Sequence, residues 1–353
     1  MAVTYVAGNR AIGTNAERLA LNSLQVSGVG GWKELARTTL GSSSSTIDVT
    51  SLPNKRYYMI LNTQDYYAYG RVGNSTVDTG TNYAERYSFQ GTGETAVPNY
   101  NWITMQAGGG VDGFGVTYWA NYSTKEKLHI GHYVDKNATG AANAPKRSET
   151  VGKWTNTSNP IDRFHLNTQD ANTFSSGSEV VVLGWDPADT HTTNFWTELS
   201  STTLSSTAST IDSGTIPAKK YLWIQAFVKQ ASTYTVGLQF NSDNTSSYAI
   251  RYSGNGGADG TSINTWKCAS NYSSFGGGMF LNAFIINNQS KEKLVISHTN
   301  EVDTTGAGAA SNRIEMVGKW ANTSNQITSI QLRKETGTGD LQSGTIMKVW
   351  GSN

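Results

Sequence analysis

Residues 139–161 read TGAANAPKRSETVGKWTNTSNPI, and residues 305–327 read TGAGAASNRIEMVGKWANTSNQI. Fifteen of these 23 aligned positions are identical, at a spacing of 166 residues. A self-match of this length indicates that one folding module was duplicated, and an internal repeat must be settled before any fold is assigned. The chain is therefore expected to contain two copies of one module.

Further matches on both sides of this stretch define the extent of the module. WKEL at residues 32–35 answers WTEL at residues 196–199, and KEKL at residues 125–128 recurs at residues 291–294. The predicted organisation is an N-terminal arm (1–31), a first module (32–186), a linker (187–195) and a second module (196–353). A polar linker of this length suits either two modules joined flexibly or two modules packed side by side.

Several segments shared by the modules have the composition and length of β-strands. They are rich in Val, Ile, Tyr and Trp and are bounded by Gly, Asn, Asp, Ser and Pro, which is typical of strands. They span residues 56–61, 128–134 and 179–185 in the first module and residues 220–226 and 346–350 in the second. We therefore expect an all-β protein with two tandem jelly-roll-like β-sandwich domains.

The N-terminal arm has no counterpart in the second module. Thr14 and Glu17 fit a capping box, in which the Thr side chain caps a helix and the Glu side chain reaches back to it. One short helix is expected there. Because a helix this short is marginal in water unless something holds it, we expect the arm to be held against the chain's own domains or a neighbouring subunit, and to act as an anchor in assembly.

The composition argues against several classes of partner. The formal net charge is +1, and Lys and Arg are scattered along the chain, so there is no long-range field to attract nucleic acid or an acidic membrane surface. No stretch approaches the roughly 20 apolar residues of a membrane span, and no secretory signal is visible at the start. Cys268 is the only cysteine, which excludes an intrachain disulfide and fits synthesis in a reducing cytoplasm.

Residues identical in both modules are expected to serve the fold that the modules share. Trp154 and Trp320 are predicted to be core or strand-end aromatics with a satisfied indole N–H. Arg147 and Glu149 lie two residues apart, hence on one face of a strand, and are predicted to form a structural ion pair with the neighbouring strand.

The histidines are predicted to be ordinary strand residues. His132 and His298 occupy equivalent positions, and His129, three residues before His132, points to the opposite face of its strand. The second module has Val295 where the first has His129, so a metal site would need further ligands from elsewhere. No metal or cofactor is expected.

No catalytic residues are predicted. Hydrolysis of a glycosidic bond needs two carboxylates in one pocket, and Asp65, Asp112, Asp162 and Asp170 follow no recognisable spacing. Neither a Gly-x-Ser-x-Gly elbow before a helix nor a phosphate-binding loop is present.

Aromatic residues that differ between the modules are the best candidates for binding. The first module carries Tyr66, Tyr67 and Tyr69 in one loop-like run, and Trp119 where the second has Ile285. Exposed tyrosines can stack on sugar rings or contact a protein partner at low entropic cost. The alternative is that they pack into the sandwich or a subunit interface.

Taken together, the shared motifs resemble a repeat module of virion proteins of marine tailed phages, cyanophages among them. They are Trp-x-Glu-Leu, Tyr-Ala-x-Arg-Tyr-Ser, Lys-Glu-Lys-Leu, Arg-x-Glu-x-Val-Gly-Lys-Trp-x-Asn-Thr-Ser-Asn and, in the first copy, SGSEVVVLGW at residues 176–185. The likeness covers about residues 32–351, and the second copy departs from it at residues 340–346. It implies a virion component and supplies no site residues.

The expected function is therefore that of a non-enzymatic virion structural protein, either a capsid decoration protein or a tail appendage component. Its expected partners are other virion proteins or copies of itself. The alternative is a carbohydrate-binding protein that recognises a host surface glycan through loop aromatics, and a third hypothesis is an all-β glycan depolymerase.

Overall fold

The computed structural model describes residues 4–6, 10–12, 31–105, 111–187, 189, 193–230, 235–268, 278–302, 306–335 and 340–353. Throughout these ranges the regular structure is β-strand, arranged in several antiparallel sheets, which confirms the all-β prediction. The helix expected after Thr14 lies outside the described residues. The described part contains no helix that could span a membrane. Near the N-terminus, β1 (Thr4–Val6) pairs with β2 (Arg10–Ile12).

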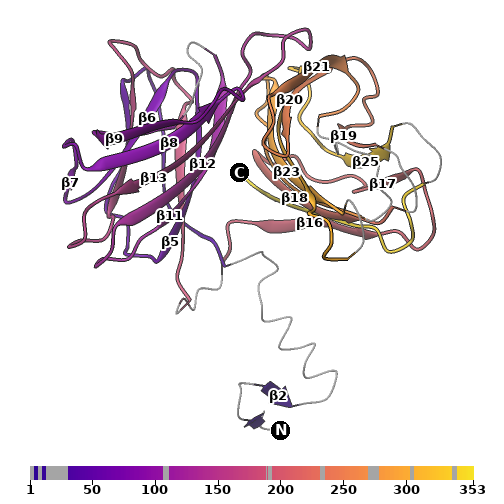
Figure 1. The fold of residues 1–353 in the computed structure, drawn as a ribbon, viewed down its shortest axis with the longest axis horizontal. Helices are drawn as coiled ribbons and strands as arrows, with labels where there is room; N and C mark the ends of the chain where they lie inside the picture. The colour runs from indigo at the N-terminus through magenta and orange to yellow at the C-terminus, as the bar shows by residue number, and fades with distance from the viewer. Residues whose placement is uncertain are drawn as a thin grey trace.

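Strands from residues 33–185 form the two sheets of the first module (Figure 1). Its eight-stranded sheet runs, in spatial order, β3 (Lys33–Thr39), β15 (Glu179–Trp185), β5 (Tyr57–Gln64), β11 (Gly113–Ala120), β12 (Lys127–Asp135), β13 (Lys146–Trp154), β8 (Tyr83–Phe89) and β9 (Thr95–Tyr100). Its five-stranded sheet contains β10 (Ile103–Thr104), β6 (Ala68–Asn74), β14 (Arg163–Thr168), β4 (Thr46–Val49) and β7 (Thr76–Val77).

Strands from residues 197–352 repeat this arrangement in the second module. Its eight-stranded sheet runs β16 (Thr197–Thr203), β26 (Ile346–Ser352), β18 (Tyr221–Val228), β22 (Met279–Ile286), β23 (Lys293–Glu301), β24 (Asn312–Trp320), β20 (Tyr248–Gly254) and β21 (Gly260–Thr265). Its three-stranded sheet is β17 (Thr210–Asp212), β25 (Ile330–Lys334) and β19 (Val236–Phe240). The large sheets therefore share one strand order, as a duplication requires.

The core of each sandwich lies between its large and its small sheet. Apolar side chains of both sheets form one buried cluster in each module. Trp154 and Trp320 are both 1% exposed, and their indole N–H groups donate to Asp78 Oδ2 and Asp243 Oδ2, each at 2.7 Å. These contacts confirm that the two tryptophans are core residues with satisfied polar atoms.

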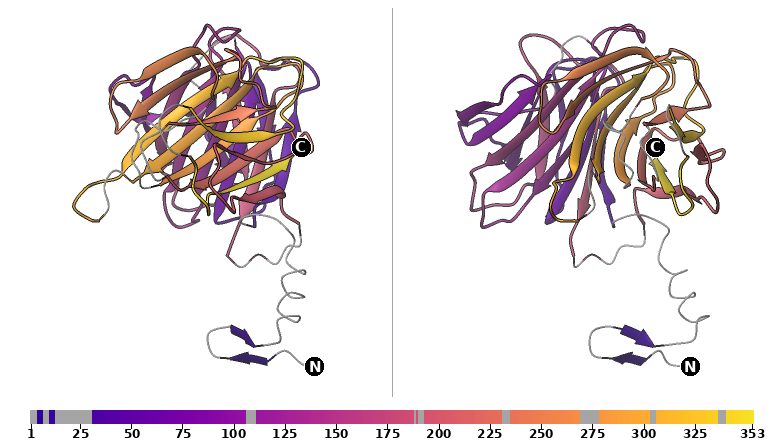
Figure 2. Two further views of the ribbon diagram at one scale, coloured as in Figure 1. Left: turned by 90° about the vertical axis from the view of Figure 1, so that its right-hand side faces the viewer. Right: turned by 45° about the vertical axis from the view of Figure 1, so that its right-hand side comes forward.

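The two modules pack side by side through the outer faces of their large sheets, which resolves the alternative left open for the linker. When module 2 faces the viewer, the large sheets overlap (Figure 2, left). A third buried apolar cluster joins them, with Met59, Phe114 and Val134 from module 1 and Trp223 and Ile296 from module 2 among its members. This cluster makes the sandwiches one continuous packed structure.

The linker contributes to the same interface at its C-terminal end. Phe195 is 6% exposed and belongs to the cluster between the modules. Its backbone N–H donates to the Trp32 carbonyl oxygen at 2.7 Å, and Lys55 is paired with Asp189. The linker is therefore held against both modules at these points.

Candidate functional site

Trp119 lies in the core of module 1. Its side chain is 1% exposed and packs beside His129, with ring centroids 4.9 Å apart. Trp119 belongs to the buried cluster between the two sheets of module 1, whereas its neighbour Tyr118 packs against the cluster between the modules. This position of β11 therefore points into the sandwich. The packing alternative therefore applies to Trp119.

The three tyrosines of the predicted binding run are half-buried. Tyr66 and Tyr67 meet edge to face at 5.9 Å, and Tyr66 packs against the core of module 1. Tyr69, on β6, lies 4.6 Å from the ring of Trp102, which in turn contacts Tyr100 at 4.7 Å. The structure thus places Tyr69 in an aromatic cluster on the five-stranded sheet.

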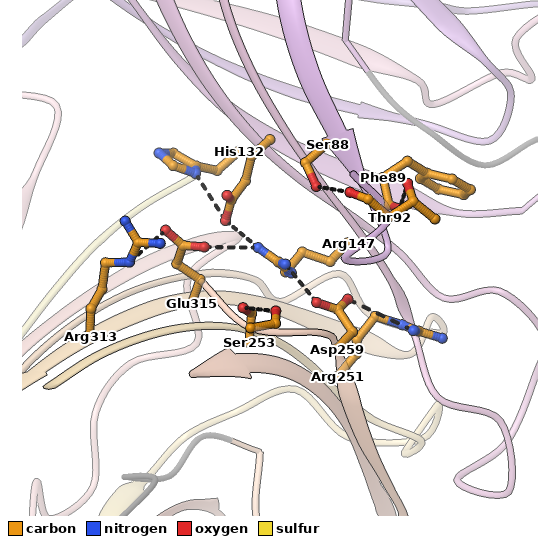
Figure 3. A network of polar contacts seen from close by, with 12 residues as sticks. Ser88, Phe89, Thr92, His132, Arg147, Arg251, Ser253, Asp259, Arg313 and Glu315 are labelled. Atoms are coloured by element: carbon orange, nitrogen blue, oxygen red, sulfur yellow. Dashed lines mark hydrogen bonds and ion pairs between the residues drawn. The ribbon is translucent and has the colours of Figure 1, made fainter. Parts of the chain in front are cut away.

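A polar cluster centred on Arg147 occupies the interface between the large sheets (Figure 3). Arg147 Nη1 donates to Glu149 Oε1 at 2.6 Å and to Glu315 Oε2 at 3.1 Å, and Nη2 donates to Asp259 Oδ1 at 2.6 Å. The side chain of Arg147 is 6% exposed and that of Asp259 is 2% exposed. One arginine of module 1 therefore holds two carboxylates of module 2.

This arrangement corrects the predicted role of Arg147 and Glu149. The two side chains do share one face of β13, but the further partners of Arg147 come from the second module rather than from the neighbouring strand. The reason is that this face of the sheet is covered by module 2. Sequence periodicity places a residue on a face but does not say what covers that face.

His132 and His298 meet at the interface, with ring centroids 4.4 Å apart. Burial lowers the pKa of His132 well below 6.5, and the neighbouring His298 lowers it further. Burial also lowers the pKa of His298. His129 points the other way, into the core of module 1, where its Nε2 lies 3.3 Å from Tyr133 Oη. The predicted opposite orientation of His129 and His132 is confirmed.

Ligand atoms of His132, Glu149 and His298 lie within 4.8 Å of one another, which raises the question of a metal ion. Glu149 Oε1, which lies 3.9 Å from His132 Nδ1, already accepts a 2.6 Å bond from Arg147. A cation at this point would have to displace the guanidinium or share the site with its positive charge. The donor set therefore fits an ion-pair cluster better than a metal centre.

Glu149 and Glu315 lie close together at the interface, and glycoside hydrolysis requires two neighbouring carboxylates. Burial raises the pKa of Glu315, and the charge of Glu149 raises it further. However, Arg147 bridges the two carboxylates and so occupies the position where a glycosidic oxygen or a water would have to lie. This geometry binds two modules together and offers no free acid.

An apolar surface, here called the open face, lies on the outer side of the large sheet of module 1. Leu128, Ile130 and Val151 are 57%, 50% and 49% exposed. All three line a shallow depression of about 560 Å³. Leu128 and Ile130 also line a second depression of about 420 Å³, together with Trp32, Tyr118 and Trp185. Neighbouring exposed apolar residues of this kind mark a binding surface more often than scattered ones do.

The duplicate of the open face in module 2, here called the covered face, is buried. Strand register makes Leu128 equivalent to Leu294, because Leu128 pairs with Ala120 and Lys153, and Leu294 pairs with Ile286 and Lys319. The three duplicates of the exposed residues, Leu294, Ile296 and Val317, are 1%, 3% and 1% exposed. They are covered by module 1.

Sequence reasoning missed both the interface cluster and the open face. Leu128 and Leu294 sit in the same KEKL motif, and comparison of the modules assigns both to the shared fold. The only signal was that Leu128, Ile130 and Val134, at outward positions of β12, are apolar where an exposed sheet face would be polar.

No family model and no curated protein matches this chain. Among solved structures, domains LG4-5 of the mouse laminin alpha1 chain are 11% identical over 90% of each chain, with a TM-score of 0.19. Ail, the attachment invasion locus protein of Yersinia pestis, is 6% identical over 76% of this chain and 98% of its own, with a TM-score of 0.13. Likenesses at TM-scores this low assign neither a fold family nor a function.

Proposed function

We propose that this chain is a non-enzymatic structural protein of a phage virion, acting as a capsid decoration protein or a tail appendage component. In this proposal its two modules are jelly-roll-like sandwiches, the N-terminal arm anchors it on the particle, and it acts by contact with other virion proteins or with its own copies.

The observation that carries the proposal is that a buried polar cluster of this chain joins the two modules. Arg147, Glu149, Glu315 and Asp259 form ion pairs across the module interface. Charges that are mutually paired hold a rigid assembly unit together but are not free to act on a substrate. The resemblance of the shared motifs to phage virion modules supports the same function.

The location of the protein tests this proposal directly. Purified particles would be analysed by mass spectrometry and by immunogold labelling with an antibody against the chain. The expected result is labelling of particles with the chain present in many copies. Particles that assemble in its presence yet contain none of it would contradict the proposal.

The arm can be tested in the same system. A variant lacking residues 1–30 is expected to be lost from particles, with the sandwiches still folded as judged by circular dichroism. Incorporation equal to that of the full chain would exclude the arm as the anchor.

A second candidate function, glycan binding, is favoured by the aromatic cluster on the five-stranded sheet. Tyr69 and Trp102 are half-buried, and the Arg71 guanidinium carbon lies 5.5 Å from the Trp102 ring centroid. Aromatic rings beside a hydrogen-bond donor are a common way to hold a sugar. A glycan array with the full chain and with Tyr69→Ala would test it, and a signal unchanged by Y69A would exclude this cluster as the site.

A further inference from the structure

We propose that the open face of module 1 binds module 2 of a second copy of this chain, by the same head-to-tail contact that joins the two modules within one chain. The inference deepens the proposed structural function by naming a partner. Its test uses the purified protein, so its failure is distinguishable from absence of the protein from particles.

Within one chain, a loop of module 1 sits on the covered face of module 2. This loop, residues 136–145, is called the docking loop. Lys319 Nζ donates to the Lys136 carbonyl oxygen at 3.0 Å. The backbone N–H of Gly140 donates to Glu292 Oε1 at 2.6 Å. The covered face therefore binds the backbone of the docking loop through the ammonium group of Lys319 and the carboxylate of Glu292.

The open face carries the equivalent pair of charged side chains, and there the pair is exposed. Glu126 and Lys153 are the duplicates of Glu292 and Lys319, and their side chains pair at 2.8 Å. The side chains of Lys319 and Glu292 are 0% and 2% exposed beneath the docking loop, whereas those of Lys153 and Glu126 are 41% and 40% exposed. Module 1 therefore carries the receiving pair without the loop that covers it in module 2.

A second receiving group is also duplicated. Arg251 Nε donates to the Pro145 carbonyl oxygen, at the end of the docking loop, at 2.8 Å. Its counterpart Arg86 has a side chain that is 53% exposed and is paired with Glu94. Arg86 also lines the 560 Å³ depression of the open face, which corresponds to the position of the docking loop on module 2.

In the sequence, residues 302–311 of the second module are the copy of the docking loop, and the structure describes residues 306–311 of this copy. The first three residues of the repeated stretch, TGA, are identical in the two loops. Gly140 and Gly306 have φ values of +89° and +92°, a conformation that favours glycine. Residues 306–311 are exposed. Residues 306–311 of module 2, which begin with the same glycine turn, are therefore presented to solvent.

The apolar part of the contact is only partly duplicated. The surface of module 2 that would face the open face is less apolar than the equivalent surface of module 1. Phe114 of module 1 is 1% exposed in the interface, and its counterpart Phe280 of module 2 is 45% exposed. The positions of Val116 and Val134 are taken by Asn282 and Asn300. The contact between copies therefore buries less apolar surface than the contact within the chain, and we expect it to be weaker and concentration-dependent.

Equivalent residues of the two modules are buried to different extents, and this difference indicates the symmetry of the contact between modules. In a two-fold symmetric interface a residue and its equivalent would be buried to the same extent, but Leu128 and Leu294 are 57% and 1% exposed. The contact is head-to-tail, and such contacts leave one donor and one acceptor surface free at the ends. Repetition between chains would give a ring or a filament.

Sedimentation velocity over a range of protein concentrations tests the proposal. The full chain is expected to form oligomers as its concentration rises. Two variants should each abolish them: Leu128→Glu with Ile130→Glu, which charges the open face, and Gly306→Val, which strains the turn of the free docking loop.

Mixing the two variants provides the sharpest result. The L128E/I130E chain keeps its docking loop, and the G306V chain keeps its open face, so one contact can still form between them. The expected product is a one-to-one dimer and nothing larger. Thr76→Glu on the small sheet and Gly214→Val, at the turn after β17 with a φ of +66°, are the matched controls and should associate as the full chain does.

Three results would overturn the proposal. The first is a chain that stays monomeric at every concentration its solubility allows. The second is association that survives in both variants, whose folding is checked by circular dichroism. The third is association that appears only after removal of residues 1–30, which would assign the open face to the arm of the same chain.

Discussion

At the scale of single residues, Trp154 and Trp320 join the two sheets of their sandwiches at equivalent corners. Each ring is buried in the core of its module, and each indole N–H donates to an aspartate of a loop, Asp78 or Asp243. Because a buried donor without a partner is costly, the aspartate and the tryptophan are coupled. A residue that the repeat marks as structural is thus explained by one hydrogen bond.

Replacement of Trp320 by Phe should lower the free energy of unfolding by about 1–3 kcal/mol, since it removes the bond to Asp243 and leaves a small void. Urea unfolding followed by circular dichroism would measure the change. Trp185→Phe, on the half-buried edge of the open face, is the matched control and should have a smaller effect. Equal effects of the two substitutions would show that the bond to Asp243 adds no stability.

The two interface histidines should make stability depend on pH. Burial lowers their pKa in the folded protein below 6.5, so the unfolded chain binds protons first as the pH falls. Their contribution is therefore present above about pH 6.5 and is lost progressively as the pH falls toward the folded-state values. The double variant His132→Gln with His298→Gln should lose less stability than the original chain between about pH 7.5 and pH 5.5.

The double histidine variant must be compared with the original chain, because other groups also titrate between about pH 7.5 and pH 5.5. Burial raises the pKa of Asp135 to about 6, and a raised carboxyl pKa adds stability as the pH falls through that value, which opposes the histidines. Asp135 is present in both proteins, so its contribution largely cancels in the difference. Identical pH profiles would contradict the assigned role of the histidines.

At the scale of elements, β13 and its duplicate β24 show how one sequence pattern serves two purposes. Arg147 on β13 points into the interface and its side chain is 6% exposed, whereas Arg313 on β24 has a side chain that is 58% exposed. Both strands keep the same Arg-x-Glu spacing. The position of the strand relative to the other module therefore decides whether the arginine joins the modules or lies in solvent.

Replacement of Arg147 by Met should destabilise the protein by about 2–4 kcal/mol, because it leaves Asp259 and two glutamates near each other without their shared cation. Replacement of Arg313 by Met should cost less than about 1 kcal/mol, as expected for an exposed ion pair. Chemical unfolding of both variants gives the comparison. A loss in R313M as large as that in R147M would contradict the assignment of Arg147 as the central group.

At the scale of the whole molecule, the modules are joined by contact as well as by the linker. A buried apolar cluster and the Arg147 ion pairs connect the large sheets. The interface therefore resembles a domain core more than a flexible hinge. It also gives the molecule two unequal ends, one with the open face and one with the free docking loop.

A protease site inserted between Pro187 and Thr193 tests this description. After cleavage the two fragments should still co-elute in gel filtration at the volume of the uncut chain, because the interface does not depend on the covalent link. The same insertion without protease treatment is the control. Fragments that separate under native conditions would show that the linker, rather than the interface, holds the modules together.

The amino-acid sequence by itself determined the all-β class, the duplication and the shared core. The strand composition, the 23-residue repeat and the alternation that sends His129 and His132 to opposite faces are local properties, and they are readable from one chain. The sequence did not determine that Trp119 is a core residue. An aromatic residue that differs between the modules can point either into the sandwich or to the outer side of the sheet.

Only the tertiary structure decided which faces are covered. Leu128 and Leu294 occupy the same motif on equivalent strands, yet they are 57% and 1% exposed. The physical reason is that burial on the outer side of a sheet is set by a surface far away in the sequence, here the other module. The repeated stretch includes residues 139–145 of the docking loop, which is seated on module 2, and residues 306–311, which are exposed. The sequence of the repeat does not distinguish the seated copy from the exposed one.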